Sequence, residues 1–182
     1  MRTIRYVVAV FTSLLALAPT AARAEENFAL WAKRMPISFG GYTPPGGGAP
    51  LTNFPALVVF SNSTAGAGFD YADFLSPPSG DLRFVAADKT TPLDFEVESW
   101  DTEGLSYVWI KVPELTADTT IYALWGKEGV AAPPCTTNGA VWCEEYNAVW
   151  HLCDGADNAH VYDSTANRCH GTKKAANSPA QT

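Results

Sequence analysis

The sequence predicts an all-β protein: an antiparallel, jelly-roll-like β-sandwich followed by an incomplete second β module. Two observations carry this prediction. Apolar and polar residues alternate along several short segments, and 13 Pro and 14 Gly residues separate those segments. A helix would repeat its apolar residues about every 3.6 positions, and none of these segments does so. With 47% hydrophobic and 17% charged residues, the composition is that of a globular chain rather than a disordered one.

The clearest alternation lies between Asp81 and Lys127, where we expect four strands, at residues 81–84, 91–100, 106–113 and 119–125. On the second strand, one face carries Leu93, Phe95 and Val97, and the other carries Asp94, Glu96, Glu98 and Trp100. On the third, one face carries Val108, Ile110 and Val112, and the other carries Tyr107, Trp109 and Lys111. The polar residues and Gly at 101–104 predict a turn between these two strands.

The first 24 residues are typical of a secretory signal peptide. Arg2 and Arg5 form the positive start, residues 6–18 form the apolar core, and residues 22–24 form an A-x-A cleavage site. The alternative is a membrane anchor, but the apolar run is too short for a span of about 20 residues. We expect export to the periplasm, the cell surface or the medium, with no membrane span in the mature chain.

The charge excludes some partners. Without the three arginines of the leader, nine basic residues remain against 19 acidic ones, a charge of −10. Such a surface repels phosphate backbones and anionic lipid, so neither nucleic acid nor a membrane surface is an expected partner.

The remaining chain divides by composition. The sandwich is expected at residues 25–128, with a first strand at 31–39, in which Pro36 indicates an edge or a bulge, and with a strand at 53–60 that is buried on both sides. A short turn or a single helical turn is expected near residues 69–74. Residues 129–139 form a linker, 140–172 a second segment with strand-like runs at 140–143 and 148–152, and 173–182 a disordered tail.

The expected binding residues lie on one outer face of the sheet: Trp100, Tyr107, Trp109, Glu96 and Glu98. Aromatic faces stack on sugar rings and carboxylates accept hydrogen bonds from hydroxyl groups, so this face predicts a polysaccharide or cell-surface glycan as ligand. The alternative is that these aromatic side chains belong to the core, or are covered by a loop or by the C-terminal segment.

No catalytic residue, cofactor or metal is predicted. Glu96 and Glu98 are about 6.5 Å apart along a strand, within the range of a glycosidase pair, but any acidic strand face has this spacing. Asp70, Asp73, Asp81 and Asp88 match no calcium-binding loop. A Ser-His-Asp triad finds no support, because no G-x-S-x-G motif is present.

Several motifs that follow one another in a fixed order resemble those of known protein families. The order FPALVVF, FDYADF, SGDLRFVAAD, PLDFEVESWD, VWIKVPEL and TTIYALWGK resembles the bacterial domain of unknown function 2341 family over roughly residues 28–127. AVWHL with YDSTANRCHGT resembles the truncated start of a concanavalin A-like, laminin-G-like lectin domain. The resemblance implies a jelly-roll-like sandwich in exported or envelope proteins, sometimes beside polysaccharide-active modules or proton-channel subunits. It implies no catalytic residues.

The four cysteines, Cys135, Cys143, Cys153 and Cys169, lie in the last third of a chain expected to be exported, which favours disulfides. Three pairings are possible. Local closure favours Cys135–Cys143, and the lectin-like opening implies neighbouring strands for Cys153–Cys169. A metal site using His151, Cys153, Cys169 and His170 is the weaker alternative, because no C-x2-C spacing is present.

Together these features predict an exported, non-catalytic surface or envelope module that recognises polysaccharide or mediates adhesion. Two alternatives remain: an accessory part of a polysaccharide-active enzyme, and a structural spacer without a ligand. Exposure of Trp100 and Trp109 separates the first function from the spacer.

Overall fold

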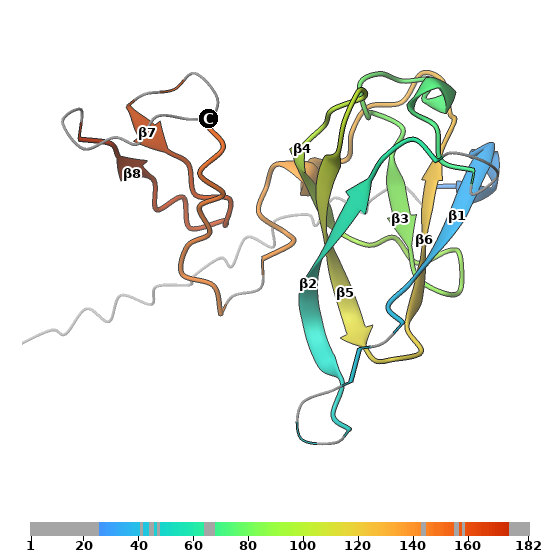
Figure 1. Ribbon diagram of the computed structural model, residues 1–182, viewed down its shortest axis with the longest axis horizontal. Coiled ribbons are helices and arrows are strands. Elements are labelled where there is room, and N and C mark those ends of the chain that lie inside the picture. The colour runs from blue at the N-terminus through green and yellow to red at the C-terminus, as the bar shows by residue number, and fades with distance from the viewer. Residues whose placement is uncertain are drawn as a thin grey trace, which may run out of the picture.

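Two antiparallel sheets of three strands face each other in the computed structural model (Figure 1). It describes residues 26–40, 42–43, 46, 48–63, 68–142, 145–154, 157 and 159–174. One sheet has the order β1-β6-β3 and the other the order β2-β5-β4. The strands are β1 Lys33–Ser38, β2 Leu51–Phe60, β3 Arg83–Val85, β4 Phe95–Ser99, β5 Ser106–Leu115 and β6 Thr120–Trp125. The predicted all-β sandwich is confirmed.

Short 3-10 turns in the described part of the chain include η1 Phe28–Leu30, η3 Tyr71–Asp73 and η4 Pro134–Thr136. The side chain of Asp70 accepts a hydrogen bond of 2.9 Å from the amide of Ala72 and so caps η3. An aspartate just before a turn satisfies an amide that has no partner within the turn. The turn expected near residues 69–74 is confirmed.

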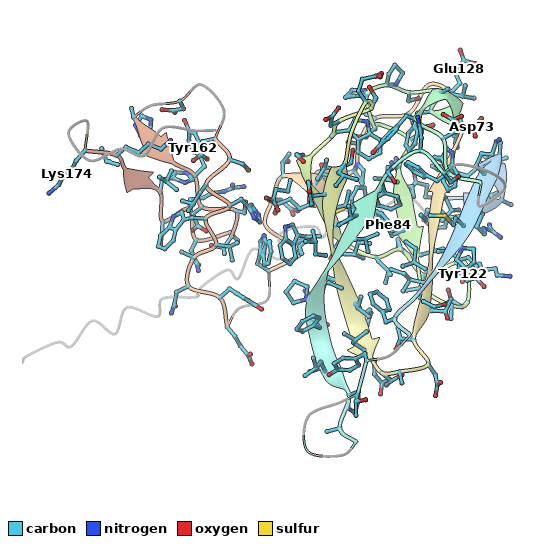
Figure 2. All side chains as sticks on the ribbon, viewed as in Figure 1. Asp73, Phe84, Tyr122, Glu128, Tyr162 and Lys174 are labelled. Atoms are coloured by element: carbon cyan, nitrogen blue, oxygen red, sulfur yellow. The ribbon has the colours of Figure 1, made fainter. Side chains whose placement is uncertain are left out.

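The core fills the space between the two sheets (Figure 2). It contains the inward-facing residues predicted from the alternation, including Phe95, Val108 and Ile110, each no more than 1% exposed. Phe84 from the opposite sheet packs against Phe95, with ring centroids 5.0 Å apart. Full burial of each such side chain stabilises the fold by about 1.5–3 kcal/mol.

One predicted direction is wrong, because a β-bulge interrupts β4. Glu96 lies opposite Trp109 and Val97 opposite Val108, but the register then shifts so that Ser99 lies opposite Tyr107. The extra residue moves the following side chain to the other face. Trp100 is therefore half-buried and packs against the core, with its ring 5.2 Å from Tyr71 and 5.0 Å from Phe74, instead of pointing outwards beside Glu98.

The expectation that residues 53–60 are buried on both sides is also wrong. Leu57 and Val59 are 43% and 49% exposed, because in a sandwich of two sheets only one face of β2 meets the core, and β2 is also an edge strand. A continuous apolar run does not distinguish a central strand from an edge strand. Pro36, in contrast, lies in β1, at the edge of the other sheet, as its missing amide hydrogen predicts.

The loops at one end of the sandwich converge on Asp81, which is completely buried. Its Oδ2 accepts hydrogen bonds from the amides of Leu75, Gly126 and Lys127 at 2.9–3.0 Å, and its Oδ1 accepts one from Ser76 at 3.3 Å. This carboxylate therefore joins the loop before β3 to the chain that leaves β6. These four hydrogen bonds give Asp81 a structural role.

The chain beyond residue 140 forms a smaller unit beside the sandwich (Figure 1). Only two short strands, β7 His160–Val161 and β8 Gly171–Thr172, pair there among the described residues. Residues 140–142 and 148–152 are not strands, contrary to expectation. The side chains of Trp142 and His151 contact Glu96 of the sandwich, whereas the backbone of Val149 bonds within the smaller unit. Buried Asp163 organises this unit by accepting hydrogen bonds from the amides of Val149, Thr165 and Cys169. We call residues 145–174 the C-terminal segment.

None of the helices in the described part of the chain is long and apolar enough to cross a membrane. The expected signal peptide and the expected disordered end of the tail lie outside the described residues.

Candidate functional site

The C-terminal segment meets the sandwich at a cluster of polar and aromatic side chains on the outer face of β4 and β5. We call this cluster the junction. The sandwich and the loop after it supply part of the junction, and the C-terminal segment supplies the rest. Its members are Glu96, Glu98, Trp109, Trp142, His151 and Ser164.

Glu96 is the centre of the junction, and its side chain is only 13% exposed. Its Oε1 accepts a hydrogen bond of 2.6 Å from the Ser164 hydroxyl and lies 3.2 Å from Nε2 of His151. Its Oε2 accepts a hydrogen bond of 2.8 Å from the indole N–H of Trp142. Burial opposes ionisation of this carboxyl group, but the hydrogen bonds from His151, Ser164 and Trp142 outweigh burial and lower the pKa of Glu96.

Glu98 and Trp109 form the second part of the junction. The indole N–H of Trp109 donates a hydrogen bond of 2.6 Å to Oε2 of Glu98, and the same oxygen lies 3.4 Å from Nδ1 of His151. Glu96 and Glu98 are two residues apart on β4 and so face outwards together, and the strand alternation changes beyond them at the bulge.

Aromatic packing covers the polar contacts. The ring of His151 stacks on that of Trp109, with centroids 5.9 Å apart and planes at 27°. Trp142 lies 5.3 Å from Trp109 and 5.5 Å from His151, and is itself 8% exposed. Trp109 is therefore half-buried beneath the segment that follows the sandwich. This arrangement agrees with the alternative to glycan binding in which the C-terminal segment covers the aromatic side chains.

The predicted binding residues thus separate into three groups. Glu96, Glu98 and Trp109 come together in the junction, Trp100 lies in the core, and Tyr107 is half-buried on β5 opposite Val59 and Ser99. The sequence did not predict that Trp142, His151 and Ser164 lie beside these glutamates, and it suggested His151 only as a metal ligand. Trp142 and His151 lie in the aromatic motifs AVW and AVWH, which indicate that these residues pack but not which residues they pack against. Nothing in the sequence distinguishes Ser164 from other serines.

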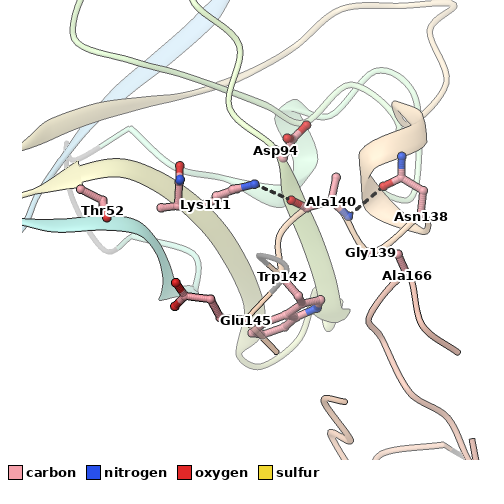
Figure 3. A pocket seen from close by; sticks show the side chains of 10 residues that line it. Thr52, Asp94, Lys111, Asn138, Gly139, Ala140, Trp142, Glu145 and Ala166 are labelled. Atoms are coloured by element: carbon pink, nitrogen blue, oxygen red, sulfur yellow. Dashed lines mark hydrogen bonds between the residues drawn. The ribbon is translucent and has the colours of Figure 1, made fainter. Parts of the chain in front are cut away.

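A polar groove of about 690 Å³ opens beside the junction (Figure 3). Lys111 on β5 donates a hydrogen bond of 3.2 Å from Nζ to the carbonyl oxygen of Ala140, which fixes the loop that forms one wall. Charged and amide side chains line the groove next to Trp142: Asp94, Lys111, Glu145, Asn53 and Asn138. These groups are hydrogen-bond donors and acceptors of the kind that recognise hydroxyl-rich ligands.

The other acidic residues considered from the sequence serve local structure. Asp88 accepts hydrogen bonds from the amides of Thr90 and Thr91 and from the hydroxyl of Thr91. Asp73 forms an ion pair with Lys33 at 2.9 Å. The hydrogen bonds from Thr91 and Thr90 lower the pKa of Asp88 to about 2. Among the described residues, no group of three or more His, Cys, Asp or Glu side chains is placed to hold a metal ion.

Cys153 and Cys169 are exposed free thiols in the structure, so the predicted bridge between them is not formed there and stays a prediction. Burial raises the pKa of the Cys153 thiol, and the charges of Glu98 and Asp154 raise it further. A raised pKa leaves less of the thiolate, which is the form that attacks disulfides and binds metals. Cys143 lies outside the described residues, so the Cys135–Cys143 bridge also stays a prediction.

In a comparison with protein families, residues 79–150 match the family model described as Domain of unknown function (DUF2341). The resemblance to this family is thereby confirmed for that part of the chain. The match runs from the end of the loop before β3 to Trp150, and so includes Glu96, Glu98, Trp109 and Trp142, while His151 and Ser164 lie beyond it. Neither the search of curated proteins nor that of solved structures found a match.

Proposed function

We propose that this protein is an exported, non-catalytic module whose sandwich holds the chain that follows it on the outer face of β4 and β5. In this function the sandwich is a structural support. The observation that carries the proposal is the environment of Glu96, whose carboxylate is shared by Trp142, His151 and Ser164. Ionised carboxylates form the stronger class of hydrogen bond, and a buried one left without its donors is destabilising.

The same contacts argue against catalysis by this pair of glutamates. A general acid at neutral pH needs a raised pKa, whereas the pKa of Glu96 is lowered. Glu98 accepts the Trp109 indole N–H and also lies beside His151. Both carboxylates are thus occupied by groups of the protein, as in a packed interface. Export rests on the signal-peptide pattern of the first 24 residues.

Replacement of Glu96 by alanine tests the structural function. In the chain from Glu25 to Thr182, Glu96→Ala should increase backbone hydrogen exchange in the C-terminal segment while β5 and β6 keep their protection. Glu103→Ala is the matched control, because Glu103 lies exposed in the turn before β5. Unchanged exchange of the C-terminal segment in Glu96→Ala would contradict the proposal.

A second candidate is recognition of polysaccharide in the groove beside Trp142, as a surface module or as the accessory part of a polysaccharide-active enzyme. The groove's carboxylates, amides and ammonium group favour it. Trp142 is too buried to offer a full stacking face, so hydrogen bonds would supply most of the affinity.

Binding to a panel of soluble and insoluble polysaccharides tests this second function, with Asp94→Ala as the groove variant. Loss of binding in a folded Asp94→Ala protein, with binding retained in Glu103→Ala, would support the groove. Trp100→Ala is unsuitable as a binding probe because Trp100 belongs to the core.

A further inference from the structure

His151 occupies an unusual position between two carboxylates. Its Nε2 lies 3.2 Å from Oε1 of Glu96, and its Nδ1 lies 3.4 Å from Oε2 of Glu98. Its side chain is 11% exposed. The two glutamates belong to the sandwich and the histidine belongs to the C-terminal segment, so both contacts cross the junction.

The chemistry of imidazole makes these two contacts depend on protonation. Ionised carboxylates only accept hydrogen bonds, and a neutral imidazole has one N–H donor and one lone pair. Whichever neutral tautomer forms, one ring nitrogen directs its lone pair at a carboxylate oxygen. Only the imidazolium donates from both nitrogens at once. Its positive charge is also favoured by the face of Trp109, on which the ring stacks.

The charged groups around His151 act in the same direction. β4 contributes Glu96 and Glu98, and the segment's own chain contributes Asp154, whose negative charge also acts on the ring. Trp109 from β5 and Trp142 from the preceding loop are uncharged, and Cys153 is kept as a neutral thiol by its raised pKa. Lys111, the cation on this face of β5, directs its Nζ to the carbonyl oxygen of Ala140.

We propose that the junction is a pH-dependent latch: protonated His151 holds the C-terminal segment on the sandwich, and loss of its proton releases the segment. The latch rests on the proposed structural function, because it describes what regulates the same contact. An exported chain meets the pH of its surroundings directly, and histidine is the side chain that ordinarily titrates in that range.

The pH range of the latch follows from two opposite shifts. Burial lowers the pKa of His151, but the hydrogen bond to Glu96 and the charges of Glu98, Glu96 and Asp154 outweigh burial and raise it above its ordinary value of 6.5. Protonated His151 therefore stabilises the contact between the segment and the sandwich fully below pH 6.5. This stabilisation is lost as the pH rises through the raised pKa. Because the pKa of Glu96 is lowered, its carboxylate stabilises the same contact fully at pH values above its ordinary pKa of 4.5. This stabilisation is lost as the pH falls through the lowered pKa. The segment is held most firmly between these two ordinary values.

Two measurements on the chain from Glu25 to Thr182 test the latch. Nuclear magnetic resonance titration gives the pKa of each histidine. Hydrogen exchange, corrected for the intrinsic effect of pH, gives the protection of the C-terminal segment at pH 6 and pH 8.5. We expect the pKa of His151 to lie above 6.5. Protection should fall about tenfold between the two pH values for each unit by which that pKa is raised, provided titration is complete at pH 8.5.

His151→Gln is the test variant and His160→Gln is the matched control. His160 also pairs with an aspartate, but it is half-exposed on β7 and lies outside the junction. His151→Gln should show low protection of the segment at both pH values, whereas His160→Gln should keep the pH dependence of the unmodified chain. Glu98→Gln should lower the pKa of His151 and leave the sandwich folded.

The outcomes separate the latch from the function beneath it. A segment that is protected equally at pH 6 and pH 8.5 would overturn the latch and leave the structural function standing. A segment that exchanges freely at both pH values would overturn both. A His151 pKa at or below 6.5 in a protected segment would also overturn the latch.

Discussion

Replacement of Asp81 by alanine should destabilise the sandwich more than any other single change in its loops. The side chain is fully buried, and its carboxylate accepts hydrogen bonds from four backbone amides in two separate loops. Alanine would leave these donors without their acceptor. A hydrogen bond to a charged group contributes about 1.5–3 kcal/mol, and the contributions of neighbouring bonds do not add fully. Because the loops can relax towards water, we expect a loss of about 3–5 kcal/mol in the free energy of unfolding.

Asp81→Asn separates hydrogen bonding from charge at the same position. Its carbonyl oxygen can take the place of Oδ2, which serves the amides of Leu75, Gly126 and Lys127, while its amino group faces the weaker contact at Ser76. We expect a smaller loss, of about 1–3 kcal/mol.

Urea denaturation followed by tryptophan fluorescence measures the loss in the free energy of unfolding for both Asp81 variants. If the slope of this free energy against urea concentration is unchanged, the unfolded states are comparable. Asp118→Ala, at an exposed position in the turn before β6, is the control and should change stability by less than about 0.5 kcal/mol. An Asp81→Ala protein that loses less than about 1 kcal/mol would refute the argument that this carboxylate holds the two loops together.

Three further predictions follow from the fold. Val108→Asp places an unpaired charge at a position with no exposed surface and should prevent folding; a soluble variant with native circular dichroism would contradict the assigned facing. Trp100→Ala should lower the free energy of unfolding by about 3–5 kcal/mol, because it removes a core ring, while Trp109→Ala should chiefly loosen the C-terminal segment; equal exchange of that segment in both variants would refute this difference. If Cys153 and Cys169 pair in the exported protein, peptide mapping without reduction will show them linked, and alkylation of both thiols without prior reduction would exclude the bridge.

The sandwich was predictable because strand alternation reports burial directly. The inward positions at Phe95, Val108 and Ile110 lie where a period of two places them. The errors arose where local pattern lacks the deciding information. The bulge adds one residue to β4, and no residue type in the sequence indicates it. The sequence therefore predicts that Trp100 points outwards, whereas its side chain points inwards. The apolar run of β2 carries no sign of its edge position, which depends on pairing with distant residues.

The candidate site was predictable only in part. Its half on the sandwich, Glu96, Glu98 and Trp109, was found because these residues share one face of neighbouring strands. Its other half comes from residues 46 to 68 positions beyond Glu96 in the chain, and no period connects them to β4 or β5. The aromatic and acidic face that the sequence predicts to bind a glycan contacts the protein's own C-terminal segment.

The most direct test of this account is a measurement of proximity between His151 and the two tryptophans of the junction. Nuclear Overhauser effects recorded at pH 6 on the chain from Glu25 to Thr182 should connect the ring protons of His151 with those of Trp109 and Trp142, whose ring centroids lie 5.9 and 5.5 Å from its own. Stacking should also displace the His151 ring protons from their unfolded chemical shifts. Shifts typical of an unfolded chain, with no effect to either tryptophan in a protein whose sandwich is folded, would contradict the claim that the sandwich holds the C-terminal segment.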